Sequence, residues 1–326
     1  MNMHCQPNPR RVQRGVALLT ALVILAIAAT LSAGMIWQRE LDTRRTANII
    51  QGDQAMEYAL GAEAWAEQIL RRDLQQSPQS VNLSQDWAMQ LPPLPVEGGT
   101  ITGRLEDLQG LFNLNNLASS APAQAQAALQ QFQRLLTELD LDPQIASAVA
   151  DWVNAGQQSR IPGGAKDEYY SRLQPPYRTA MQPMGSVSEL LLVKGVTPAI
   201  YAQLLPYICT LPVQPPDSAP VTAMQATPIN LNTAPAPVLM SLNDGISESN
   251  AAAVVQARAQ HPFQSVNDLN QLLQIKTAAG IPTGLISSYF QLTAHVRIGD
   301  TRITLYSLLY KSGNGFVAIR RSFGTL

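Results

Sequence analysis

The stretch VALLTALVILAIAATLSAGMIW, from Val16 to Trp37, contains no charged side chain and decides the fold. An α-helix needs about 20 apolar residues to cross a bilayer, so this stretch is long enough to span a membrane. Residues 1–15 before it carry Arg10, Arg11 and Arg14 and no acidic side chain. Because basic residues stay on the cytoplasmic side, we expect a cytoplasmic N-terminus and export of the rest of the chain.

We favour a membrane anchor that stays on the mature protein after the residues before it are removed. Two other interpretations compete with it. A secretory signal peptide has an apolar region of about 7–15 residues, and this one is longer. A simple signal anchor is the other alternative. Gly15 lies directly at the boundary between polar and apolar sequence, so a cut after it leaves the whole apolar helix on the mature protein. This arrangement resembles the leader of type IV pilins and type II secretion pseudopilins. The resemblance implies cleavage by prepilin peptidase between Gly15 and Val16, followed by N-terminal methylation.

Position five of the mature chain departs from the pattern of these leaders. Most such proteins have Glu there, whereas counting from Val16 gives Thr20. A carboxylate inside a membrane is costly unless it has a partner. In the pilin family, that Glu is thought to pair with the N-terminal amine of the subunit ahead in the fibre. A subunit at the tip has no neighbour ahead, and Thr20 therefore resembles the K-type minor pseudopilin, which lacks the Glu.

The chain on either side of its middle predicts a pilin-like framework. Helical periodicity continues from Gln38 to Gln76, and Ser77-Pro78 ends it. Leu91–Pro95 is predicted as a turn or linker, and residues 100–108 alternate as in a strand. The C-terminal part predicts an antiparallel meander of three strands with hairpin turns at Gly299-Asp300 and Ser312–Gly315, which the strand at 100–108 joins. The predicted meander strands are 289–298, 302–311 and 316–323.

The middle of the chain, residues 116–285, is mostly helical and interrupted by prolines. Helices are expected at 121–139, 143–153, 188–193, 199–205, 235–242, 248–259 and 266–273. A Pro-, Ala- and Thr-rich linker at Leu211–Thr227 divides them into two lobes. The expected fold class is α+β: a long pilin-like N-terminal helix and a small antiparallel sheet, with a large all-α domain inserted between strands. The expected parts are a leader at 1–15, a transmembrane segment at 16–37, a pilin-like domain at 38–112 and 286–326, and an insertion at 113–285 with lobes at 113–212 and 228–285.

Six short motifs, in order and spacing, resemble general secretion pathway protein K, the large minor pseudopilins of type II secretion. They are Leu111–Asn115, Asp151-Trp152, Gly163–Tyr170, Pro175–Arg178, Ser188–Leu190 and Ile229–Ala234. The resemblance covers nearly the whole chain. It implies a tip complex with the I- and J-type minor pseudopilins above the major pseudopilin, assembled on the inner-membrane secretion platform. The resulting short fibre pushes folded proteins through the outer-membrane channel.

The same resemblance implies calcium near the loop that follows the Asp-Trp motif. Calcium takes six to eight oxygen ligands, usually with several carboxylates. The candidates here are Asp151, Asp167 and Glu168. Members of the family often have acids where this chain has Asn154, Gly156 and Lys166. Fewer carboxylates and an added cation weaken a calcium site, so a solvated loop is the favoured interpretation.

Other activities find less support. Residues 229–269 also resemble helix-hairpin-helix DNA-binding modules, but the turn Leu242–Ile246 carries Asp244, and the flanking cations are Arg258 and Lys276. Nucleic-acid binding depends on basic residues that neutralise phosphate, and the net charge of this chain is −1. We therefore expect no nucleic-acid partner. We expect no enzymatic activity, because the sequence has no phosphate loop, no Gly-x-Ser-x-Gly and no Cys/His metal spacing. Removal of Cys5 with the leader would leave Cys209, which lies between Ile208 and Leu211, as a free thiol that we expect to be buried.

Overall fold

The computed structural model describes residues 10–90, 92–156, 158–212 and 225–324, with side chains described from Val16 onward. All side chains of the predicted leader at 1–15, including that of Cys5, therefore lie outside the described part of the structure. Much of the predicted linker at Leu211–Thr227 also lies outside the described residues.

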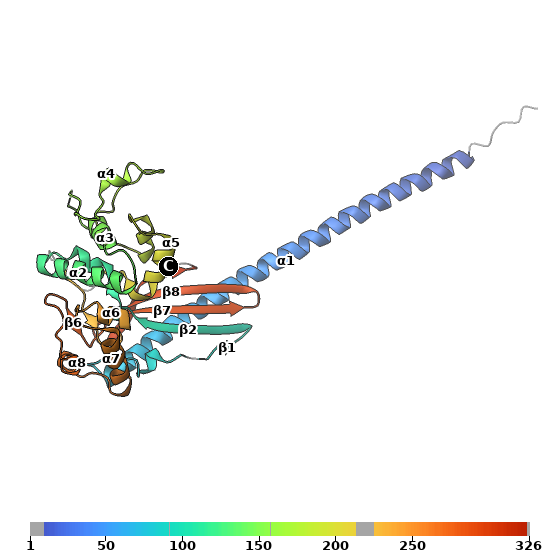
Figure 1. The fold of residues 1–326 in the computed structure, drawn as a ribbon. Coiled ribbons are helices and arrows are strands. Elements are labelled where there is room, and N and C mark those ends of the chain that lie inside the picture. Colours follow the sequence, from blue (N-terminus) through green and yellow to red (C-terminus); the bar gives the residue numbers. More distant parts are fainter. Residues whose placement is uncertain (1–9, 91, 157, 213–224, 325–326) are drawn as a thin grey trace, which may run out of the picture.

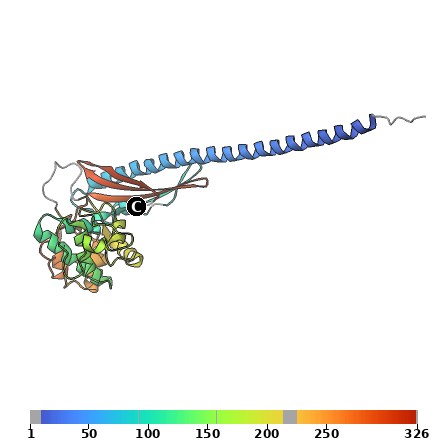
Figure 2. The same cartoon turned by 90° about the horizontal axis from the view of Figure 1, so that it is seen from above.

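One continuous helix, α1 (Arg10–Gln76), runs for 67 residues and projects far from the rest of the molecule (Figures 1 and 2). Its apolar segment is exposed along its length and is long and apolar enough to cross a membrane. The second half packs on the sheet through small side chains at Ala55, Ala59 and Ala66, which are buried. Spacings of four and seven residues place these alanines on one helix face and allow close approach. The helix ends at Gln76, as predicted.

The sheet has five antiparallel strands in the order β1-β2-β7-β8-β9, and α1 crosses one face of it. The strands are β1 (Leu94–Val96), β2 (Gly99–Asp107), β7 (Tyr289–Ile298), β8 (Thr301–Ser312) and β9 (Gly315–Phe323). The predicted meander and its pairing with the earlier strand are confirmed. The predicted turn or linker at Leu91–Pro95 was wrong at its C-terminal end, because Leu94–Val96 pairs with β2 as an edge strand, where proline is tolerated.

A first hydrophobic core lies between α1 and the sheet. Trp87 and Phe290 meet edge to face with ring centroids 5.2 Å apart, and Phe316 contacts Phe290 in the same way at 5.5 Å. One acid of α1 is buried in this layer: Glu63, 4% exposed, pairs with Arg321 of β9 at 2.7 Å. The pair connects the anchor helix to the last strand of the sheet.

A helical block lies beyond the end of the sheet at which β2 ends and β7 begins (Figure 1). Its helices are α2 (Pro122–Glu138), α3 (Ile145–Val153), α4 (Asp167–Tyr170), α5 (Pro198–Leu204), α6 (Ala236–Met240), α7 (Glu248–Gln260) and α8 (Val266–Leu273). Short 3-10 helices occur along the chain at η1 (Asp86–Ala88), η2 (Leu108–Gly110), η3 (Leu114–Ala118), η4 (Val187–Leu192) and η5 (Leu205–Tyr207). The block has its own core, in which Phe112 stacks on Phe132 at 5.0 Å.

The block is not purely helical. The two-residue strands β3 (Phe112–Asn113) and β4 (Ile208–Cys209) pair in parallel, as do β5 (Ile229–Asn230) and β6 (Thr283–Gly284). Contrary to our expectation, the insertion is therefore not all-α, because it contains these two short strand pairs. The α+β class predicted for the whole chain is unchanged. Cys209 is a buried free thiol, as predicted, and its pKa is raised by burial.

Candidate functional site

Thr20, at position five of the predicted mature chain, lies on the exposed apolar part of α1. Its Oγ1 donates a hydrogen bond of 3.0 Å to the carbonyl oxygen of Ala17, one turn earlier. In a membrane every polar group needs a partner, and this hydroxyl finds one inside its own helix. The Thr20 side chain therefore carries no charge that would need a partner on a neighbouring helix.

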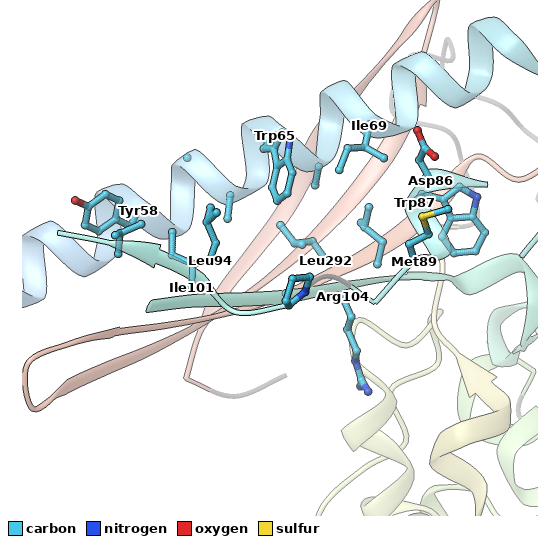
Figure 3. A pocket seen from close by; sticks show the side chains of 17 residues that line it. Tyr58, Trp65, Ile69, Asp86, Trp87, Met89, Leu94, Ile101, Arg104 and Leu292 are labelled. Atoms are coloured by element: carbon cyan, nitrogen blue, oxygen red, sulfur yellow. The ribbon is translucent and has the colours of Figure 1, made fainter. Parts of the chain in front are cut away.

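An apolar groove lies between α1 and the edge of the sheet (Figure 3). We call it the α1–β1 groove; its volume is about 400 Å³. Tyr58, Trp65 and Ile69 of α1 face Leu94 and the neighbouring strands across it. The remaining lining residues are Gly61, Ala62, Ala66, Asp86, Trp87, Met89, Pro92, Val96, Ile101, Gly103, Arg104, Leu105 and Leu292.

Several apolar side chains of the groove remain accessible to a partner. Trp65 is 47% exposed, Leu94 is 47% exposed and Met89 is 58% exposed. Contiguous exposed apolar surface of this kind marks sites of interaction with a protein or a membrane. The groove escaped sequence analysis because the prolines around Leu94 concealed the edge strand that forms one wall.

The structure places the three predicted calcium ligands in separate interactions. Asp151 is fully buried, and its Oδ1 pairs with Nη1 of Arg160 at 2.6 Å. Asp167 accepts hydrogen bonds at Oδ1 from the backbone N–H and the hydroxyl of Thr179, at 2.9 and 2.7 Å. These bonds lower the pKa of Asp167. Glu168 is exposed and pairs with Arg172 one turn later.

No cluster of three or more metal-ligating side chains occurs among the residues that the structure describes. The three acids therefore do not fit a shared calcium site, for which several carboxylates must converge. Instead, Lys166 is 4% exposed and its Nζ donates to the carbonyl oxygens of Asp151 and Asn154, each at 2.5 Å. Burial lowers the pKa of Lys166, and the Asp151 carboxylate opposes that effect.

In the sequence, Lys166 was recognisable only as a cation that weakens a calcium site, and the role of Arg160 could not be recognised. An arginine and a lysine in a loop that follows a buried Asp were the available signal. The loop is also closely packed: a Cβ added at Gly164 would lie 2.2 Å from Oδ2 of Asp151.

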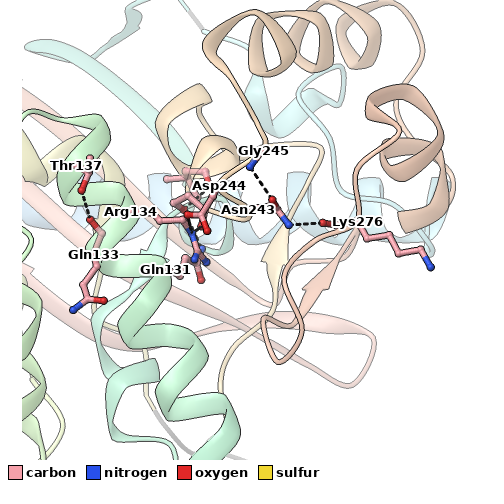
Figure 4. A network of polar contacts seen from close by, with 10 residues as sticks. Gln131, Gln133, Arg134, Thr137, Asn243, Asp244, Gly245 and Lys276 are labelled. Atoms are coloured by element: carbon pink, nitrogen blue, oxygen red, sulfur yellow. Dashed lines mark hydrogen bonds and ion pairs between the residues drawn. The ribbon is translucent and has the colours of Figure 1, made fainter.

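The turn that resembled a DNA-binding hairpin is held by its own side chains (Figure 4). Asn243 accepts from the backbone N–H of Gly245 at 2.8 Å and donates to the carbonyl of Lys276 at 3.0 Å. Asp244 is 82% exposed at its side chain and faces Arg134 at 3.7 Å. The turn thus presents an acid to solvent, where phosphate binding requires donors and cations.

One of the two predicted flanking cations is not available to a ligand. Arg258 is 7% exposed and donates from Nη1 to the carbonyl oxygen of Leu231 at 2.8 Å. Burial lowers its pKa to about 10. These contacts favour the interpretation of residues 229–285 as a packing module.

The Asn-rich motifs have a structural role that their sequences did not reveal. Asn113 accepts at Oδ1 from the backbone N–H of Leu211, and Asn115 donates to the carbonyls of Met184 and Leu211 at 3.0 and 2.9 Å. In the last motif, Asn232 donates to the carbonyl of Phe263 at 3.1 Å. In each motif an Asn side chain forms hydrogen bonds with buried backbone groups of a distant segment. Buried backbone groups outside helices and sheets need such partners.

Similarly, the Asp-Trp and Ser-Glu-Leu motifs meet. Glu189 accepts from the backbone N–H of Gly185 at 2.7 Å and, in the capping box that begins η4, from that of Ser186 at 3.3 Å. Its second oxygen accepts from the indole Nε1 of Trp152 at 3.4 Å. The spacing of these motifs therefore reflects contacts in the folded block.

A long apolar helix that continues into a packed spine on a small antiparallel sheet defines a membrane-anchored, pilin-like protein. Residues 110–213 and 229–291 match the two domains of the family described as "Type II secretion system (T2SS), protein K". The chain belongs to this family. An apolar N-terminal helix of this kind is consistent with an inner-membrane anchor, and the role of the chain is that of a minor pseudopilin in type II secretion.

Individual relatives agree over nearly the full length. The chain is 35% identical to type II secretion system protein K of Pseudomonas aeruginosa, over 95% of this chain and 92% of that protein. It is 33% identical to the Aeromonas hydrophila protein, over 98% of this chain and 99% of that protein. A chain in the crystal structure of the GspK-GspI-GspJ complex from the enterotoxigenic Escherichia coli type 2 secretion system matches with a TM-score of 0.69 and 26% identity, covering 86% of this chain and all of that chain.

Proposed function

We propose that this chain caps the tip of the type II secretion pseudopilus and primes its assembly for export of folded proteins across the outer membrane. The observation that carries the proposal is Thr20, whose hydroxyl is satisfied by Ala17 within α1. A subunit inside the fibre would need a group at this position for the amine of the subunit ahead. A terminal subunit has no such requirement, and the role is structural rather than catalytic.

The proposed topology follows from the anchor. Prepilin peptidase cuts between Gly15 and Val16 on the cytoplasmic side, and residues 16–37 remain in the inner membrane as a single pass. The rest of the chain is periplasmic, with a pilin-like domain at 38–112 and 286–326 and an insertion at 113–285. The exposed apolar face of α1 and the preceding arginines support this orientation.

The proposed partners are the I- and J-type minor pseudopilins, with the major pseudopilin below them and the inner-membrane platform at the base. The similar Escherichia coli chain comes from a complex with GspI and GspJ, which supports the first two. The α1–β1 groove supports a contact with a partner helix, because one wall of it is formed by exposed apolar side chains of α1, the same helix that carries the apolar segment 16–37. A partner anchored in the same bilayer would present its own apolar helix alongside.

Coexpression tests this proposal directly. The full chain, coexpressed with I- and J-type partners and purified in mild detergent through a tag on this chain, should be recovered with one copy of each. Native mass spectrometry gives the composition. Recovery of this chain without either partner, under conditions in which the two partners bind each other, would refute the proposed complex.

A further inference from the structure

The carbonyl oxygens at the C-terminal end of α3 accept hydrogen bonds from other parts of the protein. The last carbonyls of a helix lack intrahelical partners, and the dipole makes them attractive to cations. Here the carbonyl of Ala150 accepts from Asn154 Nδ2 at 2.7 Å, and that of Trp152 accepts from the backbone N–H of Met181 at 2.9 Å. The carbonyl of Asp151 accepts from Nζ of Lys166 at 2.5 Å.

Lys166 connects this helix end to the loop that follows it. Its ammonium also donates to the carbonyl of Asn154 at 2.5 Å, while the whole residue is 4% exposed. A buried ammonium is costly unless it is hydrogen-bonded and close to negative charge. Both conditions hold, because two carbonyl oxygens bind it and the buried acid Asp151 belongs to the same helix turn.

The Asp151 carboxylate is neutralised from the opposite side. Oδ2 accepts from the backbone N–H of Arg160 at 2.9 Å, and Oδ1 accepts from the Arg160 guanidinium at 2.6 Å. Arg160 therefore contributes both main chain and side chain to one acid. The loop between Asn154 and Lys166 is thus held to the end of α3 at its middle by Arg160 and at its C-terminal end by Lys166.

A divalent cation would find few free ligands at this position. Calcium takes six to eight oxygens, whereas Asp151, the buried carboxylate here, is already paired, and the ammonium repels a second cation. We infer that Lys166, together with Arg160, supplies the positive charge that a bound metal ion would otherwise supply at this helix end. The loop consequently folds and holds the helical block without calcium. This inference concerns the stability of the chain and is independent of its place in the fibre.

Thermal unfolding of the detergent-solubilised full chain at neutral pH tests the inference. The wild-type midpoint should change by less than about 1 °C between excess chelator and excess calcium, with magnesium at equal ionic strength as a reference. Lys166→Met keeps the aliphatic stem but leaves two carbonyls unpaired, so its midpoint should fall by about 4 °C or more. Lys276→Met, which changes an exposed lysine, should leave the midpoint unchanged.

A charge reversal provides the complementary arm. Lys166→Glu places a carboxylate beside the same carbonyls, so calcium but not magnesium should raise its midpoint by several degrees. The inference is overturned if calcium raises the wild-type midpoint by more than about 1 °C above the magnesium reference, if Lys166→Met matches wild type, or if a folded Lys166→Glu variant is indifferent to calcium. Should Lys166→Glu fail to fold, the wild-type and Lys166→Met measurements decide the question.

Discussion

Nδ2 of Asn230 donates a hydrogen bond of 3.0 Å to Oδ2 of Asp107, 123 residues earlier in the chain. The same carboxylate oxygen accepts from the hydroxyls of Thr233 and Ser287, each at 2.6 Å. Asp107 ends β2, whereas these three donors to Oδ2 belong to the helical block and to the segment that returns to β7. Burial raises the pKa of Asp107, and the hydrogen bonds oppose this rise. One buried carboxylate therefore fixes the block on the end of the sheet.

Asp107→Asn should destabilise the protein by about 3 kcal/mol. The carboxylate accepts hydrogen bonds from several buried donors, and in the variant an amide NH₂, itself a donor, would replace one of its two accepting oxygens. Chemical denaturation of the solubilised chain measures this change. Asp300→Asn, an exposed change in the β7–β8 turn, is the matched control and should stay within about 0.5 kcal/mol of wild type. Equal stability of the two variants would show that the Asp107 network does not hold the block.

Trp65→Glu should weaken assembly with the I-type partner at least tenfold, because it places a charge in the apolar α1–β1 groove. The control is Leu191→Glu on η4, which is 44% exposed, close to the 47% of Trp65, but lies outside the groove. Quantitative co-purification compares the two. If Leu191→Glu reduces recovery as strongly as Trp65→Glu, the groove is not the contact surface.

Asp167→Asn should make the protein less stable than wild type at pH 7, and this difference should become smaller at acid pH. Hydrogen bonds from Thr179 lower the folded-state pKa of Asp167. The stability that the carboxylate contributes is thus present above its unfolded pKa of about 3.9 and is lost as the pH falls through the lower folded value. Denaturation series from pH 7 to about pH 3 should show the two proteins converging. A constant difference across that range would exclude this role for Asp167.

Gly15→Ala should block maturation, because prepilin peptidase requires the glycine that precedes the cut in leaders of this type. Intact-mass measurement should give a wild-type chain that begins at Val16 and carries a methyl group, and a variant that keeps residues 1–15. Accumulation of mature-sized Gly15→Ala protein, or a wild-type start near residue 29 or 34, would assign the N-terminus to a different signal.

Periodicity determined most of what could be predicted. The small residues at Ala55, Ala59 and Ala66 marked the packed face of α1, and strict alternation from Tyr289 to Phe323 marked the meander. Leu94–Val96 was missed because two of its neighbours and one of its members are prolines, and edge pairing depends on where β2 lies in space. The two-residue parallel pairs are too short to have a period.

The candidate site was harder to predict because it depends on contacts between distant residues. The composition of the loop indicated that calcium would bind weakly, but not that Lys166 reaches the end of α3 or that Arg160 pairs with Asp151. The cleavage site between Gly15 and Val16 remains a prediction. Likewise, Asn113, Asn115 and Asn232 were recognised as parts of motifs, whereas their buried hydrogen bonds follow only from the fold.

The most direct test of the proposed tip position counts copies of this chain in purified pseudopili sorted by length. Gold labelling through a C-terminal tag locates each copy, and quantitative mass spectrometry gives its ratio to the major pseudopilin. A tip subunit predicts one labelled end per fibre and a ratio that falls as fibres lengthen. Label distributed along the fibre, with a ratio independent of length, would contradict the account.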